Sequence, residues 1–294
     1  MKNDAVLLIS HGSSLPFAEN TFKEICKKFN EFSTLPAEVG YMKVSKPTIA
    51  QAIKKLKEDS PDINRIFALP VFLAPGIHTN VDIPIILGLN PLETDPRCPD
   101  GNYSEDHYLY GLEKIDFNGE IKLLNPIGPD EDLLKIIDNR IASALNESKL
   151  NEDSKTGILL VSHGSRLKYN KEFISALYDK FSKNSKYPSN FGFMELETPA
   201  IPESIKKLTS ENDIERLIVV PVFIAPGVHT TNDIPTILGL KENTGHSHSH
   251  DHGDHHHHHD LEPVDFDGEI LYPNPIGADD ILIEILQKKI NNEL

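Results

Sequence analysis

The sequence predicts an α/β protein made of two tandem, duplicated units, each a small parallel sheet flanked by helices as in flavodoxin-like and Rossmann-like folds. Three observations support this prediction: a length of 294 residues, an internal duplication, and short apolar segments that alternate with helical ones. The duplication pairs residues 6–13 with 158–165, and His78 with His229, at an offset of about 150 residues. That period is far too long for a solenoid repeat, so each copy is expected to be a small domain.

The elements of each unit follow from its apolar pattern. The first strands, 5–9 and 157–161, are short apolar runs rich in branched residues, as expected of strands buried on both faces. The other strands are expected at 37–43 and 190–196, 65–72 and 216–224, and 120–124 and 269–272. Helices are expected at 17–32 and 168–182, after Pro47 and Pro199, from the N-caps Asp82 and Asp233, and at 130–145 and 279–292. Such alternation predicts a parallel sheet with helices on both faces.

The two units are expected to span residues 1–147 and 148–294, with a polar linker at 146–155. The copies differ most between the third helix and the fourth strand. There the first copy carries an acidic, proline-containing insert at 90–113, whereas the second carries a histidine-rich loop at 245–260. Because the two units are fused in one chain, a monomer is expected.

Composition argues against several classes of protein. The formal net charge of −16 disfavours nucleic acid as a partner, since its binding depends on clustered Lys and Arg. No apolar run approaches the roughly 20 residues of a membrane span, and the N-terminus lacks a signal-peptide pattern, so a cytoplasmic protein with no membrane partner is expected. Two cysteines make no disulfide framework, and without a Cys-x-x-Cys motif no iron–sulfur cluster is expected.

Polar side chains follow three strands of each expected sheet. Ligands of open parallel sheets bind outside the carboxyl ends of the strands, and these ends converge if the first strand lies between the second and third. His11 and His163 end the first strand, Lys43 and Glu195 end the second, and His78 and His229 follow the third. Two neutral imidazoles and a carboxylate predict an open site for a divalent first-row metal, and the imidazoles are also bases near neutral pH.

A purely structural interpretation of these residues stays open. His-Gly-Ser also suits a tight strand-to-helix turn, in which Gly12 and Gly164 relieve backbone strain and Ser13 and Ser165 cap the next helix. Glu195 also suits a solvated position. The recurrence of the histidine pair in both copies favours function. By contrast, Asp82 and Asp233 are expected to be caps, the Asn-Pro-Ile-Gly segments turns, and Cys26 a core residue.

The segment 245–260 interleaves nine histidines with Asp, Ser and Gly, so it cannot pack a core. These histidines are His246, His248, His250, His252, His255, His256, His257, His258 and His259. Clustered imidazoles bind Ni²⁺, Co²⁺, Cu²⁺ and Zn²⁺, which favours metal storage or delivery; a dispensable linker is the alternative.

Three motifs together resemble the class II chelatases of the CbiX/SirB type. They are Val-Ser-His-Gly-Ser-Arg at 161–166, Phe-Met-Glu at 193–195, and Pro-Val-Phe-Ile-Ala-Pro-Gly-Val-His-Thr-Thr-Asn-Asp-Ile-Pro at 221–235. The resemblance covers nearly the whole chain twice, as in a fusion of two short-form units. It implies a chelatase-like fold and insertion of a metal into sirohydrochlorin, an octacarboxylate tetrapyrrole of cobalamin and siroheme biosynthesis, in a cleft between the units.

The resemblance also implies roles for individual residues. His11 and His163 correspond to the metal-binding, proton-accepting histidine of the family, and His78 and His229 to its second metal ligand. Glu195 corresponds to the glutamate after Met, where the first copy has Lys43, so the second copy is the more complete. Apart from the resemblance, Arg166, Lys43 and Lys46 near the predicted rim are expected to offset the repulsion between an acidic protein and an anionic substrate. The other residues expected at the substrate are Ser13, Ser165, Ala225, Gly227, Ala74 and Gly76.

The expected mechanism holds the metal at His163, His229 and Glu195, with His163 accepting one of the two pyrrole protons that leave. Co²⁺ is favoured from the long-form resemblance, with Ni²⁺ or Fe²⁺ as alternatives, and no organic cofactor is expected. Two other functions stay open: a protoporphyrin ferrochelatase, disfavoured by the lack of an apolar membrane-docking surface, and a metal storage or delivery protein that uses the histidine-rich loop.

Overall fold

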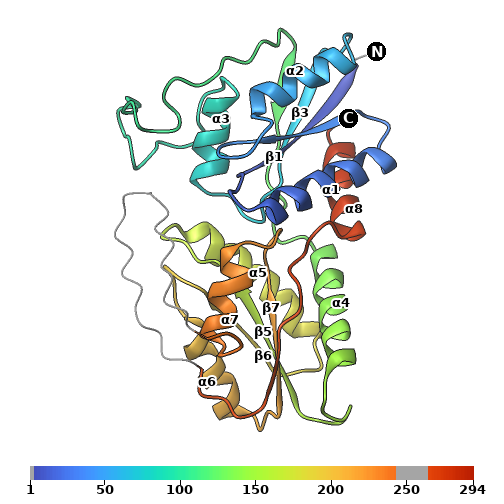
Figure 1. The fold of residues 1–294 in the computed structure, drawn as a ribbon, viewed down its shortest axis with the longest axis vertical. Coiled ribbons are helices and arrows are strands. Elements are labelled where there is room, and N and C mark those ends of the chain that lie inside the picture. The colour runs from blue at the N-terminus through green and yellow to red at the C-terminus, as the bar shows by residue number, and fades with distance from the viewer. Residues whose placement is uncertain (1–2, 243–263) are drawn as a thin grey trace.

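The computed structural model describes residues 3–242 and 264–294, and in these ranges the chain forms two four-stranded, all-parallel sheets (Figure 1). The strands of the first sheet are β1 (Asp4–Ser10), β2 (Ala37–Tyr41), β3 (Arg65–Pro70) and β4 (Glu120–Leu123), and those of the second are β5 (Thr156–Ser162), β6 (Ser189–Phe193), β7 (Arg216–Pro221) and β8 (Glu269–Leu271). The first sheet has the order β2-β1-β3-β4, and the second repeats it as β6-β5-β7-β8. The duplicated fold is confirmed, and the structure places the first strand between the second and third, the condition under which the strand ends converge.

The central strands are buried on both faces. Every residue from Ala5 to Ile9 of β1 has no exposed surface, and Ile158 to Val161 of β5 are equally covered. Continuous branched and aliphatic residues therefore lie where helices cover both sides of a parallel sheet. The second strands end at Tyr41 and Phe193, before the residues expected from the sequence, because the chain turns there toward the next helix.

Helices connect the strands on both faces of each sheet. They are α1 (Pro16–Phe32), α2 (Ile49–Asp59), α3 (Ile83–Ile86), α4 (Asp132–Glu147), α5 (Lys168–Asn184), α6 (Ile201–Glu211), α7 (Ile234–Ile237) and α8 (Asp280–Asn291). One π-helical turn, η1 (His78–Asp82), leads into α3, and another, η2 (His229–Asp233), leads into α7. The expectation that Asp82 and Asp233 cap these helices is wrong, because the helical turn starts four residues earlier and neither side chain makes a cap bond.

The last helix of each sequence copy packs against the other copy. Helix α4 contacts β7, and helix α8 contacts α1, as the colours of Figure 1 show. The Arg140 guanidinium of α4 donates to the carbonyl of Ile276 at 2.7 Å, and Lys28 of α1 donates to Asp280 of α8 at 2.6 Å. The two packed bodies therefore differ from the two sequence repeats, since each body includes the last helix of the other repeat.

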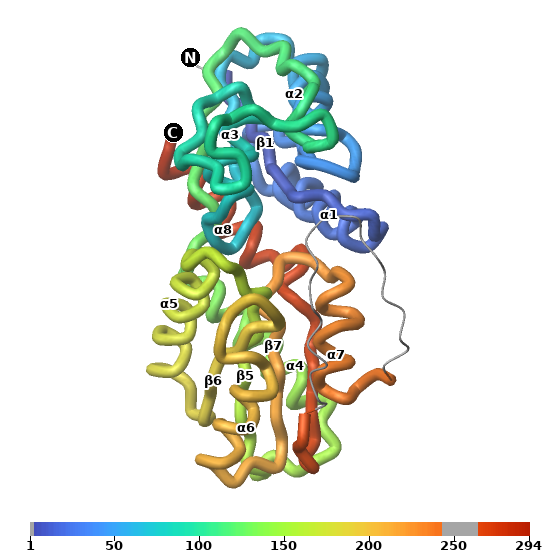
Figure 2. Tube along the Cα trace, turned by 90° about the vertical axis from the view of Figure 1, so that its left-hand side faces the viewer, coloured from blue at the N-terminus to red at the C-terminus, as the bar shows by residue number. Residues whose placement is uncertain are grey.

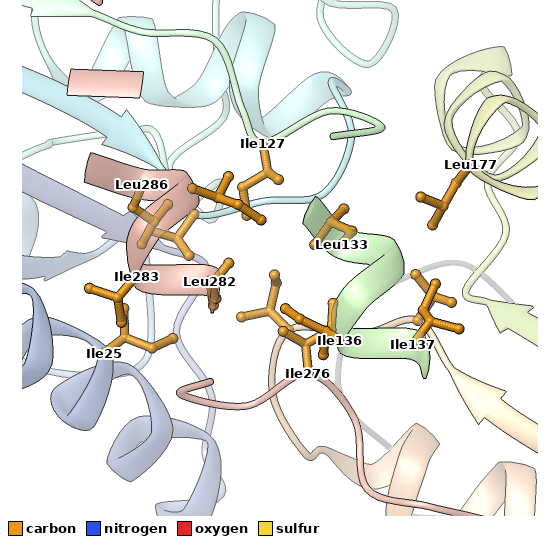
Figure 3. Close-up of a cluster of buried hydrophobic side chains, with 14 of the residues drawn as sticks. Ile25, Ile127, Leu133, Ile136, Ile137, Leu177, Ile276, Leu282, Ile283 and Leu286 are labelled. Carbon is orange, nitrogen blue, oxygen red and sulfur yellow. The ribbon is translucent and has the colours of Figure 1, made fainter. Parts of the chain in front are cut away.

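One apolar core spans both halves as a result of this exchange. Leu282, Ile283 and Leu286 of α8 are at most 1% exposed and belong to the same buried cluster as Ile25 of α1. The α4 side of that cluster is shown with them in Figure 3 and includes Leu133, Ile136, Ile137 and Leu177 of α5. On the opposite face, each sheet has a separate cluster of its own.

The exchange also sets which edges of the sheets face each other. Helices α4 and α8 begin after the carboxyl ends of β4 and β8 and cross at once to the other body, so both carboxyl edges face the boundary (Figures 1 and 2). Lys180 of α5 donates to the carbonyl of Pro129 at 3.0 Å, and the Tyr169 hydroxyl donates to Glu93. Within the described ranges, no helix has the length and apolar character to cross a membrane.

The shared core predicts that the two halves lose stability together. Leu286→Ala removes a fully buried side chain of α8 and should lower the free energy of unfolding by about 2–5 kcal/mol. Hydrogen exchange followed by mass spectrometry should show faster exchange in β1 and β3 and also in β5 and β7. Glu284→Ala, at an exposed position of α8, is the matched control. Faster exchange in one sheet alone contradicts this prediction.

Candidate metal centre

Three side chains from the segments that follow three strands meet at the carboxyl edge of the second sheet. The imidazole rings of His163 and His229 lie 4.8 Å apart between centroids, with an interplanar angle of 85°. The Nε2 atom of His163 lies 3.5 Å from Oε1 of Glu195. One ligand atom from each of the three residues lies within 4.8 Å of the others, which suits one ion with nitrogen and oxygen ligands at ~2.0–2.2 Å.

A glycine without a side chain makes this meeting possible. Gly164 follows His163 with φ +96°, a conformation that L side chains rarely adopt, and a Cβ at this position would lie 1.7 Å from the carbonyl oxygen of Glu195. The backbone N–H of Glu195 also donates to the carbonyl of His163 at 3.1 Å. The loops after β5 and β6 are therefore in direct backbone contact, which places Glu195 beside His163.

Hydrogen bonds define which nitrogen of each imidazole is free. Nδ1 of His163 lies 3.0 Å from the carbonyl oxygen of Gly164, and Nδ1 of His229 lies 2.8 Å from Oδ2 of Asp233. Carbonyl and carboxylate oxygens only accept, so Nδ1 carries the proton in both rings and each Nε2 keeps its lone pair. Such an oxygen partner orients a ligating imidazole and increases its basicity.

Electrostatics keep His163 neutral. Burial lowers the pKa of His163, and the neighbouring imidazole of His229 lowers it further. The side chains are nevertheless accessible, since His163, Glu195 and His229 expose 39%, 32% and 42% of their side-chain surface. The centre therefore combines a neutral His163 with access for an incoming ion.

The first sheet repeats the backbone of this centre with different chemistry. The rings of His11 and His78 lie 4.8 Å apart, and Nδ1 of His11 donates to the carbonyl of Gly12 at 2.9 Å. Gly12 has φ +89°, and a Cβ there would lie 1.9 Å from the carbonyl oxygen of Lys43. Lys43 stands where the second sheet has Glu195. In the described part of the chain, only the group His163, Glu195 and His229 has the spacing of a metal site.

A polar network from the insert supports His78. Nδ1 of His78 donates to Oδ2 of Asp82 at 2.5 Å, and Asp82 also accepts from Arg97 and from the Tyr108 hydroxyl. Arg97 in turn pairs with Asp95 at 2.9 Å. Burial alone would raise the pKa of Asp82, but the hydrogen bonds from His78, Arg97 and Tyr108 hold it below its usual range.

Sequence reasoning missed this network because Arg97 and Tyr108 lie in an insert with no counterpart in the second copy. The sequence spacing does indicate the role of the two aspartates. His78 and Asp82, like His229 and Asp233, are four residues apart, which places both side chains on one face of a helical turn. The two aspartates therefore orient histidines instead of capping helices.

The family model described as CbiX matches residues 5–144 and, a second time, residues 157–293. The chain belongs to the CbiX family. Among curated relatives, the sirohydrochlorin cobaltochelatase of Methanothermobacter thermautotrophicus is 46% identical over 149 residues, which are 50% of this chain and 99% of the relative. That of Methanocaldococcus jannaschii is 48% identical over 134 residues, 44% of this chain and 93% of the relative. Each relative thus matches about one copy of the CbiX unit.

Solved structures share the fold of the whole chain. SirB from Bacillus subtilis with Fe³⁺ superposes with a TM-score of 0.66 at 16% identity, covering 99% of this chain and 95% of its own. A CbiX structure described as the terminal enzyme for biosynthesis of siroheme in denitrifying bacteria gives 0.56 at 16% identity, with both chains fully covered. At 16% identity these likenesses show a shared fold and nothing about the reaction.

The other candidate residues lie around the two histidine pairs. The hydroxyls of Ser13 and Ser165 accept from Leu15 and Leu167, both at 3.1 Å, and so form short turns before the helices without capping them. The N–H groups of Gly76 and Gly227 donate to threonine hydroxyls of the adjacent π-helical turns at 2.9 Å. Ala74 and Ala225 are half-buried, whereas Lys46 and Arg166 are exposed. The nine histidines of 245–260 lie outside the described residues.

Gly164→Ala should disrupt the centre because its Cβ overlaps the carbonyl oxygen of Glu195 and its φ is positive. We expect the free energy of unfolding to fall by about 1–3 kcal/mol and Co²⁺ affinity to fall by about 10–100-fold, as measured by urea unfolding and equilibrium dialysis. Gly227→Ala is the matched control, because its Cβ meets no atom within 4 Å. Equal effects of the two substitutions would show that the loop contact is unimportant.

The stability of the protein should depend on pH through His11. Burial, with the nearby charges of His78 and Lys43, lowers the pKa of His11 from 6.5 to about 4. The unfolded chain therefore binds more protons between these values, and stability is lost as the pH falls from 6.5 to 4. In urea unfolding at pH 7 and pH 4.5, His11→Asn should reduce this loss by about 1–2 kcal/mol, allowing for partial exposure of the ring. An unchanged loss contradicts the assignment.

Proposed function

We propose that this CbiX-family protein is a chelatase that inserts a divalent metal ion into sirohydrochlorin. The observation that carries the proposal is the group His163, Glu195 and His229, whose ligand atoms lie within 4.8 Å of one another at the carboxyl edge of a sheet. The relatives named sirohydrochlorin cobaltochelatase support the substrate and the reaction. The metal ion is a substrate here, and the reaction needs no organic cofactor.

The reaction is a balanced exchange of one M²⁺ ion for two pyrrole protons. The ion is first held by Nε2 of His163, Nε2 of His229 and the Glu195 carboxylate. As the four ring nitrogens take the ion, Nε2 of His163 regains its lone pair and accepts one N–H proton. The second proton passes to the Glu195 carboxylate, which lies 3.5 Å from that nitrogen, and then to water. Asp233 keeps the His229 ring in place throughout.

Co²⁺ is the metal we favour, because the similar curated relatives are named cobaltochelatases. Imidazole and carboxylate ligands suit Ni²⁺ and Fe²⁺ as well, so a nickelo- or ferrochelatase acting on the same tetrapyrrole is the alternative. The product then belongs to cobalamin or siroheme biosynthesis. In this proposal the protein works in the cytoplasm as a monomer, with residues 1–147 and 148–294 as its two units and the substrate in a cleft between them.

The nine histidines of residues 245–260 support a second role in storing or delivering the metal. They lie on the same unit as the candidate centre, between α7 and β8. Imidazole clusters bind the same late first-row metals that the centre takes. This segment then supplies ions to the chelatase centre without being needed for the chemistry.

Removing one ligand of the centre should abolish metal insertion. His163→Ala and His229→Ala should each lower the rate of metal insertion by about 10²–10⁴-fold, because the ion loses a ligand and, at His163, the proton loses its acceptor. The measurement is the absorbance change of sirohydrochlorin with Co²⁺, Ni²⁺ and Fe²⁺. His11→Ala and His78→Ala serve as the parallel pair and should cost less than about tenfold.

Deletion of residues 245–260 separates the enzyme from a storage protein. A chelatase without this segment should keep its insertion rate at saturating metal and lose rate only at limiting metal. Loss of the reaction in the deletion variant, with the His163 and His229 variants still active, would assign the chemistry to the segment and overturn the proposed centre.

A further inference from the structure

The proposed substrate raises an electrostatic problem that the metal centre does not solve. Sirohydrochlorin carries eight carboxylates, whereas this chain has a formal net charge of −16. A local cation that no protein carboxylate contacts directly would favour binding. The inference that follows rests on the proposed function and concerns the way the substrate is held.

Lys43 is such a cation. Its side chain is only partly exposed, and its Nζ lies 4.8 Å from the centroid of the Tyr108 ring. Among the described residues, this ammonium makes no ion pair and no hydrogen bond, in contrast to the salt-bridged Lys55 and Lys57 of helix α2. Burial lowers the pKa of Lys43, which reflects the cost of keeping its charge away from water.

The Asp82 carboxylate raises the pKa of Lys43 through its charge but forms no ion pair with it. The carboxylate of Asp82 accepts instead from His78, from Arg97 and from the Tyr108 hydroxyl. Arg97 is a further cation near Lys43 and lowers the pKa of this ammonium. Arg97 is paired with Asp82 and Asp95, which leaves Lys43 as the cation of this network that contacts no carboxylate directly in the described part of the chain.

The position of Lys43 decides what the first histidine pair can bind. Its backbone N–H donates to the carbonyl of His11 at 3.2 Å, as that of Glu195 does to His163 at 3.1 Å. Equivalent glycines, Gly12 and Gly164, hold the two loops in the same contact. A cation thus replaces the third ligand of a metal centre, and it repels M²⁺ while attracting an anion.

The residues that follow add an apolar contact. Val44 is 65% exposed with φ +68°, and its counterpart Leu196 is 42% exposed with φ +61°. A left-handed conformation is unfavourable for a side chain other than glycine, most of all for a β-branched one. Two exposed aliphatic residues held in this conformation, one beside each histidine pair, suit contact with the face of a flat macrocycle.

We propose that the first histidine pair is not a metal site and that Lys43 instead binds a carboxylate side chain of the tetrapyrrole. One ion then binds at His163, Glu195 and His229, while the opposite unit anchors the anionic rim of the ring. In this arrangement the second unit binds the metal ion and the first unit binds a carboxylate of the macrocycle. Val44 and Leu196 contact the faces of the ring.

The first test measures binding of metal-free sirohydrochlorin to the full-length protein by absorbance titration, together with steady-state insertion of Co²⁺. Lys43→Met should raise both the Kd and the KM about tenfold, the effect expected of one charge-assisted contact, and leave kcat within about twofold. Lys43→Arg keeps the charge and should restore binding. Lys54→Met, on the exposed face of α2, changes the net charge equally and should have no effect. An unchanged Kd in Lys43→Met overturns the proposal.

The second test counts bound Co²⁺ by equilibrium dialysis of full-length chains, in which residues 245–260 contribute equally. Lys43→Glu recreates the ligand set of the second unit and should bind one ion more than the wild-type protein, whereas Glu195→Lys should bind one fewer. No gain in Lys43→Glu, with the fold intact by circular dichroism, contradicts the assignment of Lys43 as the residue that excludes the metal.

The two tests also separate this inference from the proposed function. A wild-type protein that binds sirohydrochlorin through Lys43 but inserts no metal would reject the chelatase and keep the anion site. A protein that inserts metal with equal KM in the wild type and in Lys43→Met would keep the chelatase and reject the anion site. Failure of the wild-type protein to bind sirohydrochlorin rejects both.

Discussion

The exchange of helices α4 and α8 is the packing constraint on which the arrangement of this protein depends. Each helix leaves the carboxyl end of its own sheet and buries its apolar face against the other half, so one buried cluster holds Leu133 and Leu282 together with residues of both sheets. Because apolar burial is the main stabilising term of a domain, this shared cluster ties the two halves together. The two carboxyl edges, with their histidine pairs, consequently face a common boundary.

On this scaffold the same backbone produces two chemically different sites. Glycines at equivalent positions bring the loops after the first two strands into contact, and in both copies an imidazole Nδ1 is held by a backbone carbonyl. A single difference, Lys43 in place of Glu195, then reverses the sign of the charge beside the histidines. Duplication keeps the geometry, and substitution at one strand end changes which ligand the geometry accepts.

The aspartates behind the second histidines have a similar division of roles. Asp233 holds His229 at 2.8 Å and leaves the metal-facing nitrogen free. Asp82 holds His78 in the same way but is also hydrogen-bonded to Arg97 and Tyr108 of the insert. The insert thus adds Arg97 and Tyr108 to the surroundings of the first histidine pair, while the second pair keeps the ligand set of a metal centre.

The sequence by itself determined the duplicated α/β fold and the strand ends at which His163, Glu195 and His229 lie, because the apolar pattern marks each buried strand and its end. The order of the strands, which brings those ends to one edge, came from the tertiary structure. It also determined membership of a chelatase-like family through its motifs. Only the tertiary structure decided the partners of Asp82 and Asp233, the network of Arg97, and the exchange of α4 and α8. An apolar helical face specifies that it will be buried but not against which sheet, and an insert without a counterpart has no pattern that locates its contacts.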